Sequence, residues 1–370
     1  MRRGMVQESE TYLLKEIFNR ERLSHIATET AAVSPGFDTK RFMKLATRDL
    51  DGLSIMQRMR QVATSLHETL PGGFKKNADI LSALAPRVNH SFAAISLSEY
   101  IALYGESDFD RSMDALKHLT RFGSSEFAIR HFLVRDLEKA LAVMRRWAED
   151  ENEHVRRLAS EGCRPRLPWS FQIKELLGNP EPAAPILDAL KADPAIYVRK
   201  SVANHLNDIT KDRPDWVLDR LSYWPRDNVH TAWIMKQALR TLIKKGNAGA
   251  LALVGASGKA EVRVDLFAVT PKKITLGDRI RIDAKITSTS DGPQRLVIDY
   301  AVHYVKKKSD AGRKVFKLKE IDLAAGATID LSISQTVKDF TTRKHAAGDH
   351  KIELMINGVV LATSGFDLKI

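Results

Sequence analysis

Apolar residues recur every three to four positions through the first 250 residues, which is the spacing of amphipathic helices. The clearest helical segments are predicted at residues 53–70, 91–104, 110–122 and 126–147. Pro71-Gly72-Gly73 ends the first of them, and short turn-like pieces such as GESD and FGSS separate the others. Connections this short favour helices that pack as pairs.

One heptapeptide recurs along this helical part. Residues 155–161 (VRRLASE) align with residues 198–204 (VRKSVAN) 43 positions later, and more loosely with residues 234–240 (IMKQALR). A period of this length is typical of HEAT-type helical hairpins. Because such repeats stack their second helices along one curved face, Arg157, Lys200 and Lys236 are expected at equivalent points of a cationic concave surface. The alternative is that each is an ordinary solvated helix residue.

The pattern changes near Gly246, where GNAGALALVGASGKA indicates the end of the last helix and a linker. Beyond it, apolar and polar residues alternate, which predicts strands at 262–267, 279–286, 296–305, 314–319, 327–333, 351–356 and 359–363. Asn357-Gly358 is a two-residue hairpin signal between the last two. Seven short strands in about 110 residues indicate a sandwich of immunoglobulin type.

Together these patterns predict a multidomain α and β protein. Residues 1–250 would form an N-terminal α-solenoid of HEAT-like repeats, and residues 260–370 an all-β immunoglobulin-like (Ig-like) sandwich. A chain of 370 residues is too long for one ordinary core, and each part is large enough to fold by burial alone.

Charge favours a polyanionic partner. The chain has 58 basic and 46 acidic residues, a formal net charge of +12, and both parts contribute to the excess. The loop KKKSDAGRK, Lys306 to Lys314, is the most basic stretch of the strand part. It is interpreted as a solvated hairpin tip, with a phosphate contact as the alternative.

Composition also excludes several kinds of chemistry. The single Cys163 rules out an intramolecular disulfide and disfavours a thiolate zinc site, and the eleven histidines lack the His-Glu-x-x-His pattern. Walker loops, dinucleotide-binding turns and nucleophile elbows are missing. We therefore expect no metal and no cofactor. Without a secretory signal or a membrane-spanning apolar run, a cytoplasmic protein is expected.

The most informative stretch is WAEDENEHVRRLASEGCRPRLPWS, residues 147–170. With Val155 inward, helical spacing places Arg157, Glu161 and Arg164 on the opposite, exposed face. Beyond them, Pro165 and Pro168 are expected to hold Trp169 in an extended segment, where its ring can lie against a planar group. The alternative is an exposed ion-paired helix followed by a tryptophan that fills the core.

Two carboxylates lie beside this predicted groove. Glu126, in SSEFAIR, is expected at the start of a helix that faces the same groove as Glu161. Arg157 ahead of Glu161 is the less favourable orientation for a helical ion pair, which argues mildly against a purely structural purpose. Acids near an anionic polymer are useful where a positive charge must be stabilised, as on a sugar whose base departs.

At these residues the chain resembles the AlkC branch of the HEAT-like DNA alkylation repair glycosylases, within the AlkC/AlkD superfamily. The resemblance rests on SSEFAIRHFL, HVRRLASEGCRPRLPWS, YVRKSVANHLNDITKDRPDWV and HTAWIMKQALRTLIKKG, which cover most of residues 120–246. The trailing sandwich matches the Ig-like domain of many AlkC members. One departure is His131, where the family commonly has proline.

The resemblance implies a monofunctional DNA glycosylase of base excision repair, which removes cationic N-alkylated bases: 3-methyladenine first, then 3-methylcytosine and 1-methyladenine. It implies action on double-stranded DNA as a monomer, without a conventional base-flipping pocket, and a location at the nucleoid when DNA is bound.

The resemblance also assigns residues. It implies that Glu126 and Glu161 are the catalytic carboxylates and that Trp169 contacts the lesion nucleotide. The implied phosphate-binding residues are Arg157, Arg164, Arg166, Lys200, Asn204 and Arg240. A non-catalytic HEAT scaffold that binds DNA or a protein is the alternative, and only base release separates the two.

Overall fold

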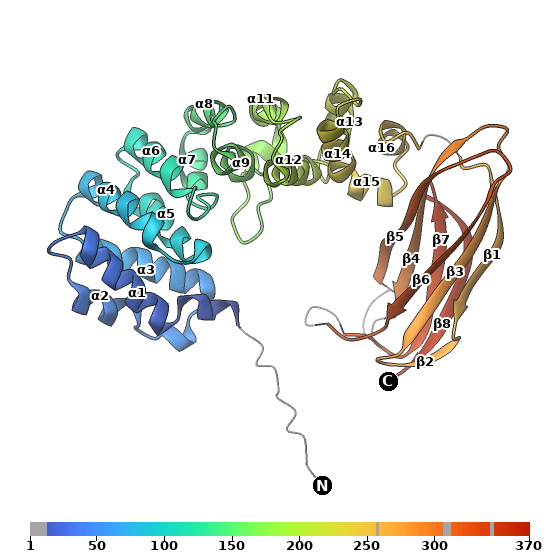
Figure 1. Cartoon of the computed structure of the whole chain (residues 1–370), viewed down its shortest axis with the longest axis horizontal. Helices are drawn as coiled ribbons and strands as arrows, with labels where there is room; N and C mark the ends of the chain where they lie inside the picture. Colours follow the sequence, from blue (N-terminus) through green and yellow to red (C-terminus); the bar gives the residue numbers. More distant parts are fainter. Residues whose placement is uncertain (1–12, 257–258, 306–311, 341–343) are drawn as a thin grey trace, which may run out of the picture. The chain divides into compact units, whose positions relative to one another are not determined.

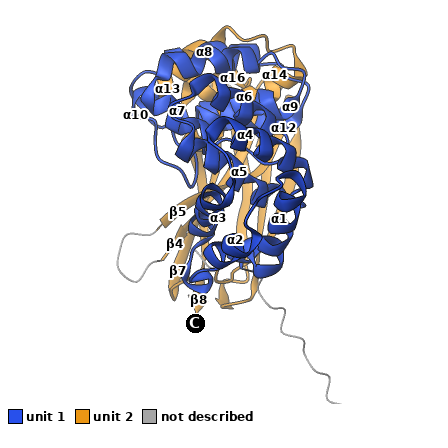
Figure 2. Cartoon of the chain, turned by 90° about the vertical axis from the view of Figure 1, so that its left-hand side faces the viewer, with its two compact units in different colours: residues 1–212 blue, residues 213–370 orange. Residues whose placement is uncertain are grey.

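The structure is a computed structural model that describes residues 13–256, 259–305, 312–340 and 344–370 (Figure 1). The chain divides into two compact units, Met1–Asp212 and Arg213–Ile370 (Figure 2). The change from helices to strands falls between Leu253 and Val262, so the second unit holds the last helices together with the strands.

The first unit is helical. Its α-helices are α1 (Arg20–Val33), α2 (Thr39–Ala46), α3 (Ile55–Thr69), α4 (Phe74–Leu84), α5 (Ser91–Tyr104), α6 (Phe109–Leu119), α7 (Ile129–Arg135), α8 (Leu137–Trp147), α9 (Glu153–Gly162), α10 (Lys174–Gly178), α11 (Ala184–Ala189) and α12 (Ile196–Ile209). Short 3-10 turns lie at Leu14–Phe18, Leu50–Gly52, Ala85–Arg87 and Glu181–Ala183.

Side-chain caps set the starts of several helices. The side chain of Ser54 accepts a hydrogen bond from the backbone N–H of Gln57, and the side chain of Gln57 accepts one from the backbone N–H of Ser54, so α3 begins with a capping box. Asn152 caps α9 in a similar way through the backbone of His154. The expected helix at residues 126–147 is in fact two, because Asp136 leaves helical geometry (φ −147°, ψ 90°) and caps α8.

The repeat corresponds to two neighbouring helices. Residues 155–161 lie in α9 and residues 198–204 in α12, and these helices pack against each other. Val155 and Val198 are both buried, as the inward register requires. The repeat therefore marks successive layers of one core.

The second unit begins with helices α13 (Pro214–Ser222), α14 (Val229–Ala238), α15 (Arg240–Lys244) and α16 (Ala248–Leu253). The strands follow as β1 (Val262–Thr270), β2 (Lys273–Thr275), β3 (Arg279–Ser288), β4 (Gln294–Tyr304), β5 (Gly312–Leu323), β6 (Thr328–Thr336), β7 (Gly348–Ile356) and β8 (Val359–Lys369). They form two sheets, in the orders β1-β3-β6 and β2-β8-β7-β4-β5.

The sandwich agrees with the expected strand pattern. Every predicted strand overlaps an observed one, whereas β2 was missed because three residues are too few to show alternation. Asn357 and Gly358 both have positive φ (47° and 78°), as their hairpin turn requires. Apolar residues from both sheets, such as Ile282 and Ile352, fill the space between them. Most of the basic loop, residues 306–311, lies outside the described residues.

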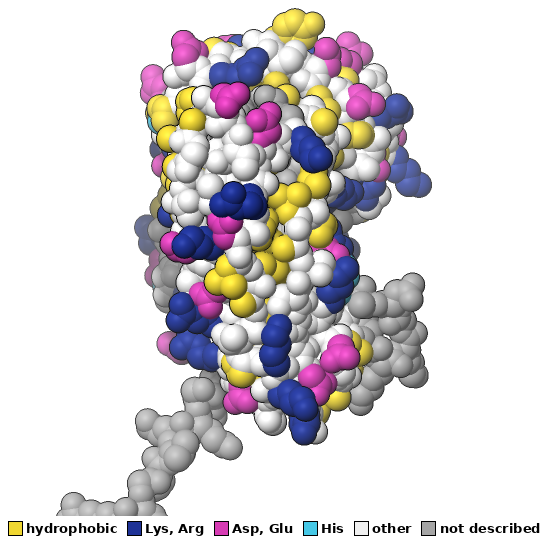
Figure 3. Space-filling model, turned by 90° about the vertical axis from the view of Figure 1, so that its right-hand side faces the viewer, with side chains coloured by type: hydrophobic (Ala, Val, Ile, Leu, Met, Phe, Trp, Pro, Cys, Tyr) yellow, Lys and Arg dark blue, Asp and Glu magenta, His cyan; other side chains and the backbone are white. Residues whose placement is uncertain are grey.

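Charges on the sandwich are mixed in sign. On the three-stranded sheet Arg263 lies 2.6 Å from Asp265, and Arg281 lies 2.8 Å from Asp283. Figure 3 shows basic and acidic side chains interspersed over that side of the molecule. Among the described residues no helix is both long and apolar enough to cross a membrane.

Candidate functional site

One arginine joins the two candidate carboxylates. Arg157, on α9, places a guanidinium nitrogen 2.6 Å from Glu126 and another 3.5 Å from Glu161, one turn further along the same helix. Glu126 lies in the turn before α7 rather than at a helix start, and also accepts a hydrogen bond of 2.9 Å from Ser124. The structure thus brings together the two glutamates that sequence reasoning had singled out.

The network of ion pairs continues into α12. Arg164 donates to Glu161 at 2.6 Å and lies 2.8 Å from Asp208, which Lys211 also contacts at 3.2 Å. Acids and bases therefore alternate from α9 across to α12. Such an arrangement holds like charges close together because an opposite charge separates each pair.

The expectation of an exposed face here is wrong. Only 5% of the surface of Glu161 and 7% of that of Arg164 is exposed, because α12 packs over the polar side of α9. Helical spacing separates the apolar from the polar face but does not show which neighbouring helix covers the polar one. Arg157 is also largely enclosed, and its guanidinium lies 4.7 Å from the centre of the Tyr197 ring.

Both arginines stay fully charged in this enclosure. Burial alone lowers the pKa of Arg157, but the carboxylates of Glu126 and Glu161 raise it, and the net shift is upward. The pKa of Arg164 is likewise raised, since Glu161 and Asp208 outweigh its desolvation. The carboxylates thus keep permanent cationic partners.

Trp169 differs from both sequence interpretations. Its backbone is left-handed (φ 64°), not extended, and 59% of its surface is exposed, so it does not fill the core. Its ring and that of Phe92 pack edge to face, with 6.2 Å between their centroids. The loop therefore displays the indole on the surface of the first unit. A positive φ at a bulky residue is uncommon and marks a constrained loop.

Arg130 holds that loop and was missed as a functional residue. Its side chain is completely buried and donates to the backbone carbonyls of Gly162 (3.0 Å), Arg164 (2.7 Å) and Phe171. Burial lowers the pKa of Arg130 to about 10, so it remains charged at neutral pH. An arginine inside the apolar phrase FAIRHFL was the available signal.

The remaining predicted DNA-binding residues are spread over both units. Lys200, on α12, is exposed, Asn204 is half-buried on the same helix, and Arg166 forms two hydrogen bonds with Asp212, at 2.8 and 3.0 Å. Arg240 belongs to the second unit, where it donates to the carbonyl of Gln237.

Lys236, the third predicted member of the cationic row, also lies in the second unit and pairs with Glu320 there.

Metal binding and thiol chemistry have little support among the described residues. In the described part of the chain, no group of three or more His, Cys, Asp or Glu side chains is arranged to hold a metal ion. Cys163 is fully buried, and burial raises the pKa of its thiol to about 12. The thiol is therefore protonated and enclosed, and it is a bystander to the charged network.

Known proteins and protein families match nearly the whole chain. A family model described as DNA alkylation repair enzyme matches residues 35–242, and one described as the C-terminal Ig-like domain of the uncharacterised protein YhaZ matches residues 263–370. The uncharacterised protein YhaZ of Bacillus subtilis is 40% identical over 356 residues, 96% of this chain and 99% of the relative.

A solved structure is similar over the same length. It is the Pseudomonas fluorescens alkylpurine DNA glycosylase AlkC, bound to DNA containing an abasic site analog. The two chains are 53% identical, the TM-score is 0.94, and the match covers 97% of this chain and 100% of the other.

Proposed function

The chain belongs to the DNA alkylation repair enzyme family, in the AlkC branch with a C-terminal Ig-like domain, and on that premise we propose that it is a monofunctional DNA glycosylase. Its partner is double-stranded DNA that contains alkylated bases. Its substrates are cationic N-alkylated bases, with 3-methyladenine first and 3-methylcytosine and 1-methyladenine as further ones.

The observation that carries the proposal is the bridging of Glu126 and Glu161 by Arg157. Two carboxylates near a DNA backbone repel it and would weaken binding. They become useful when the sugar turns cationic, because fixed negative charge in a site with little water stabilises that state more than the neutral substrate. Arg157 keeps the two acids together before the reaction begins.

The reaction follows from this arrangement. The bond between the sugar C1′ and the alkylated base breaks, and its electron pair moves to the base and neutralises the base's positive charge. Glu126 and Glu161 stabilise the oxocarbenium-like sugar that remains. Water adds to C1′ and gives its proton to a carboxylate or to solvent, which leaves an abasic site.

Other residues take supporting roles in the proposal. Trp169, displayed on its loop, contacts the lesion nucleotide or its sugar. We assign Arg157 and Arg164 to holding the carboxylates, since both are enclosed by acids. Phosphate binding is assigned to Lys200 and Arg166, with Asn204 and Arg240 as further contacts.

Base release from methylated duplex DNA tests the function. The wild-type protein is expected to release 3-methyladenine, measured by chromatography, well above the spontaneous rate. Glu161→Gln is expected to retain affinity for abasic-site DNA but to lose most excision. The matched control is Glu153→Gln, an exposed acid on the same helix, which should release base at the wild-type rate. Binding without any base release by the wild type would instead indicate a scaffold.

A further inference from the structure

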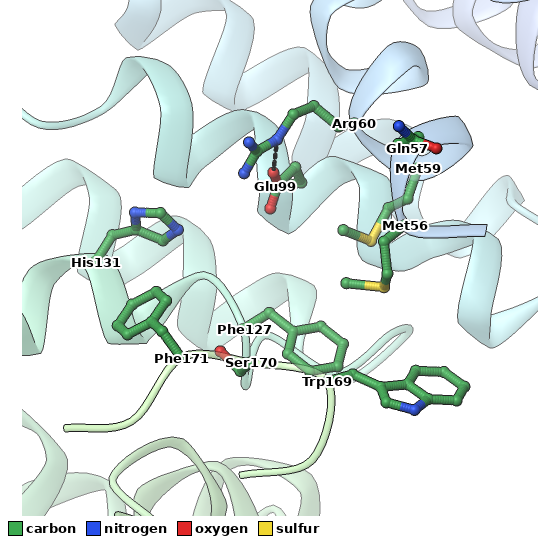
Figure 4. Close-up of a pocket in the computed structure, with 10 residues that line it drawn as sticks. All are labelled: Met56, Gln57, Met59, Arg60, Glu99, Phe127, His131, Trp169, Ser170 and Phe171. Atoms are coloured by element: carbon green, nitrogen blue, oxygen red, sulfur yellow. Dashed lines mark hydrogen bonds and ion pairs between the residues drawn. The ribbon is translucent and has the colours of Figure 1, made fainter. Parts of the chain in front are cut away.

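A second feature is a pocket beside the Trp169 loop, whose residues form part of its wall. This pocket of about 260 Å³ opens between α3, α5 and this loop, inside the first unit (Figure 4). Its lining comes from the start of α3, from Glu99 on α5, from Phe127 and His131, and from Trp169 and Phe171 of the loop. Trp169 belongs both to this lining and to the proposed DNA site, whereas neither proposed catalytic glutamate lines the pocket.

Glu99 is the buried acid of the pocket. Only 3% of its surface is exposed, and one carboxylate oxygen accepts a hydrogen bond of 2.7 Å from Arg60. No residue in the described part of the chain donates to its other oxygen, which in Figure 4 points away from Arg60 toward the aromatic side chains. A carboxylate oxygen that opens into a mostly apolar pocket is a strong acceptor, and it favours a ligand that brings an N–H donor.

The walls suit a flat ring. Phe127 and Phe171 present aromatic faces and edges, and Met56 and Met59 add polarisable thioethers that adapt to ring edges. The volume lies just below the range of about 300–1,000 Å³ that is usual for drug-sized ligands, so a single heterocycle fits better than a nucleotide.

The charges in the pocket leave room for a neutral ligand. Arg60 balances Glu99, and burial lowers the pKa of His131, which therefore stays neutral at physiological pH. An anionic ligand would be repelled by the carboxylate of Glu99. A cationic ligand would compete with Arg60 for the same carboxylate. A neutral ring with an amino group is neither repelled by Glu99 nor in competition with Arg60.

The chain links the pocket to the carboxylate pair. Phe127 directly follows Glu126, and the two side chains separate: Glu126 turns to Arg157, and Phe127 lines the pocket. Phe171 is on the loop that Arg130 ties to the end of α9. A base that leaves its sugar near Glu126 therefore has this pocket next to it.

We propose that this pocket binds a free, amino-substituted nucleobase, and in particular the alkylated adenine that the reaction releases. The free oxygen of Glu99 accepts a hydrogen bond from the exocyclic amine, as carboxylates do with amino groups of bases. The aromatic and thioether walls enclose the ring. The identity of the ligand rests on the proposed function, whereas the preference for an amino-substituted ring rests on the pocket alone.

Titration calorimetry with the full-length protein tests this. Adenine and 3-methyladenine are expected to bind at one site, and hypoxanthine, with a carbonyl in place of the amine, to bind at least about tenfold more weakly. Glu99→Gln should weaken adenine binding by about tenfold or more. Met56→Trp, which fills the pocket from its half-buried rim, should abolish it.

Two control substitutions outside the pocket distinguish a loss of base binding from a general effect of changing an acid or enlarging a methionine. Glu29→Gln removes an acid paired with Arg87 elsewhere in the unit, and Met43→Trp enlarges a half-buried methionine on α2; both should bind adenine as the wild type does. The inference is overturned if no free base binds, or if binding survives both Glu99→Gln and Met56→Trp. Base release from methylated DNA, measured in parallel, decides the proposed function independently, because it does not depend on retention of the free base.

Discussion

A guanidinium nitrogen of Arg157 lies 2.6 Å from the carboxylate of Glu126, although the two residues belong to different helical layers. The same side chain reaches Glu161 at 3.5 Å, so one cation separates two acids that would otherwise repel each other. The geometry of the proposed catalytic pair therefore depends on Arg157.

Arg157→Ala is expected to lower the free energy of unfolding by about 3 kcal/mol, because it leaves enclosed carboxylates without their partner. Glu126→Gln in the Arg157→Ala background should recover part of this loss, since it removes one of the unpaired charges. Urea unfolding of the two single variants and the double variant measures the coupling. Arg146→Ala, on the exposed side of α8, is the control and should change stability by less than about 0.5 kcal/mol. Strict additivity of the two substitutions would contradict the bridge.

Arg130→Met is expected to free the Trp169 loop, because three backbone carbonyls lose their buried donor. The loss in stability should be about 3 kcal/mol or more. Hydrogen exchange, read by mass spectrometry, should speed up over residues 163–173 more than in α3 or α5. Arg121→Met, at an exposed position, serves as the comparison. Unchanged exchange in the loop would mean that Arg130 does not hold it.

Trp169→Gly is expected to leave stability within about 1 kcal/mol of the wild type, since the ring is mostly exposed and glycine accepts the left-handed backbone without strain. Base release should nevertheless fall at least about tenfold, because the proposed contact with the nucleotide is lost. Trp169→Phe keeps an aromatic ring at the same backbone position and should retain more activity than the glycine variant. Equal activity of all three proteins would remove Trp169 from the mechanism.

Lys200→Ala is expected to lower the slope of log affinity for DNA against log salt concentration by about one, as the loss of one phosphate contact does. Lys200 is exposed, and no ion pair holds it in the described part of the chain. Arg166→Ala should lower the slope less, because Asp212 already neutralises Arg166. Fluorescence anisotropy over a salt series measures both slopes. A larger effect from Arg166→Ala would reverse this ranking of the two contacts.

Acid is expected to destabilise the first unit through His205, which is completely buried on α12. Burial, with nearby Arg164, lowers the pKa of His205 to about 3. Above the unfolded pKa of about 6.5 both states hold the neutral ring, and stability does not depend on this group. As pH falls below 6.5 only the unfolded state gains the proton, so stability falls by up to about 1.4 kcal/mol per pH unit until the folded pKa is reached.

Urea unfolding at pH 7 and pH 5.5 checks this expectation. The wild type should lose stability between the two, and His205→Leu should lose less. The comparison is made between pH values within each protein, so a general cost of the substitution cancels. An identical pH dependence in both proteins would show that His205 is not the titrating group.

The amino-acid sequence by itself determined the succession of helices and strands. A segment with one buried face repeats its apolar residues every 3.6 positions in a helix or every 2 in a strand, and this period can be recognised within the segment itself. The repeat around Val155 and Val198 showed that helices are stacked. Glu126, Glu161 and Trp169 were predicted as site residues from residue type and from the resemblance, without knowledge of their surroundings.

Tertiary packing decided the surroundings of these residues. Only the contact of α12 with α9 encloses Glu161 and supplies Asp208 as the second partner of Arg164. Only the folded loop, held by Arg130, turns Trp169 outward and shapes the pocket around Glu99. These relationships join residues far apart in the chain, and local periodicity carries no information about which distant side chain will meet a given polar group.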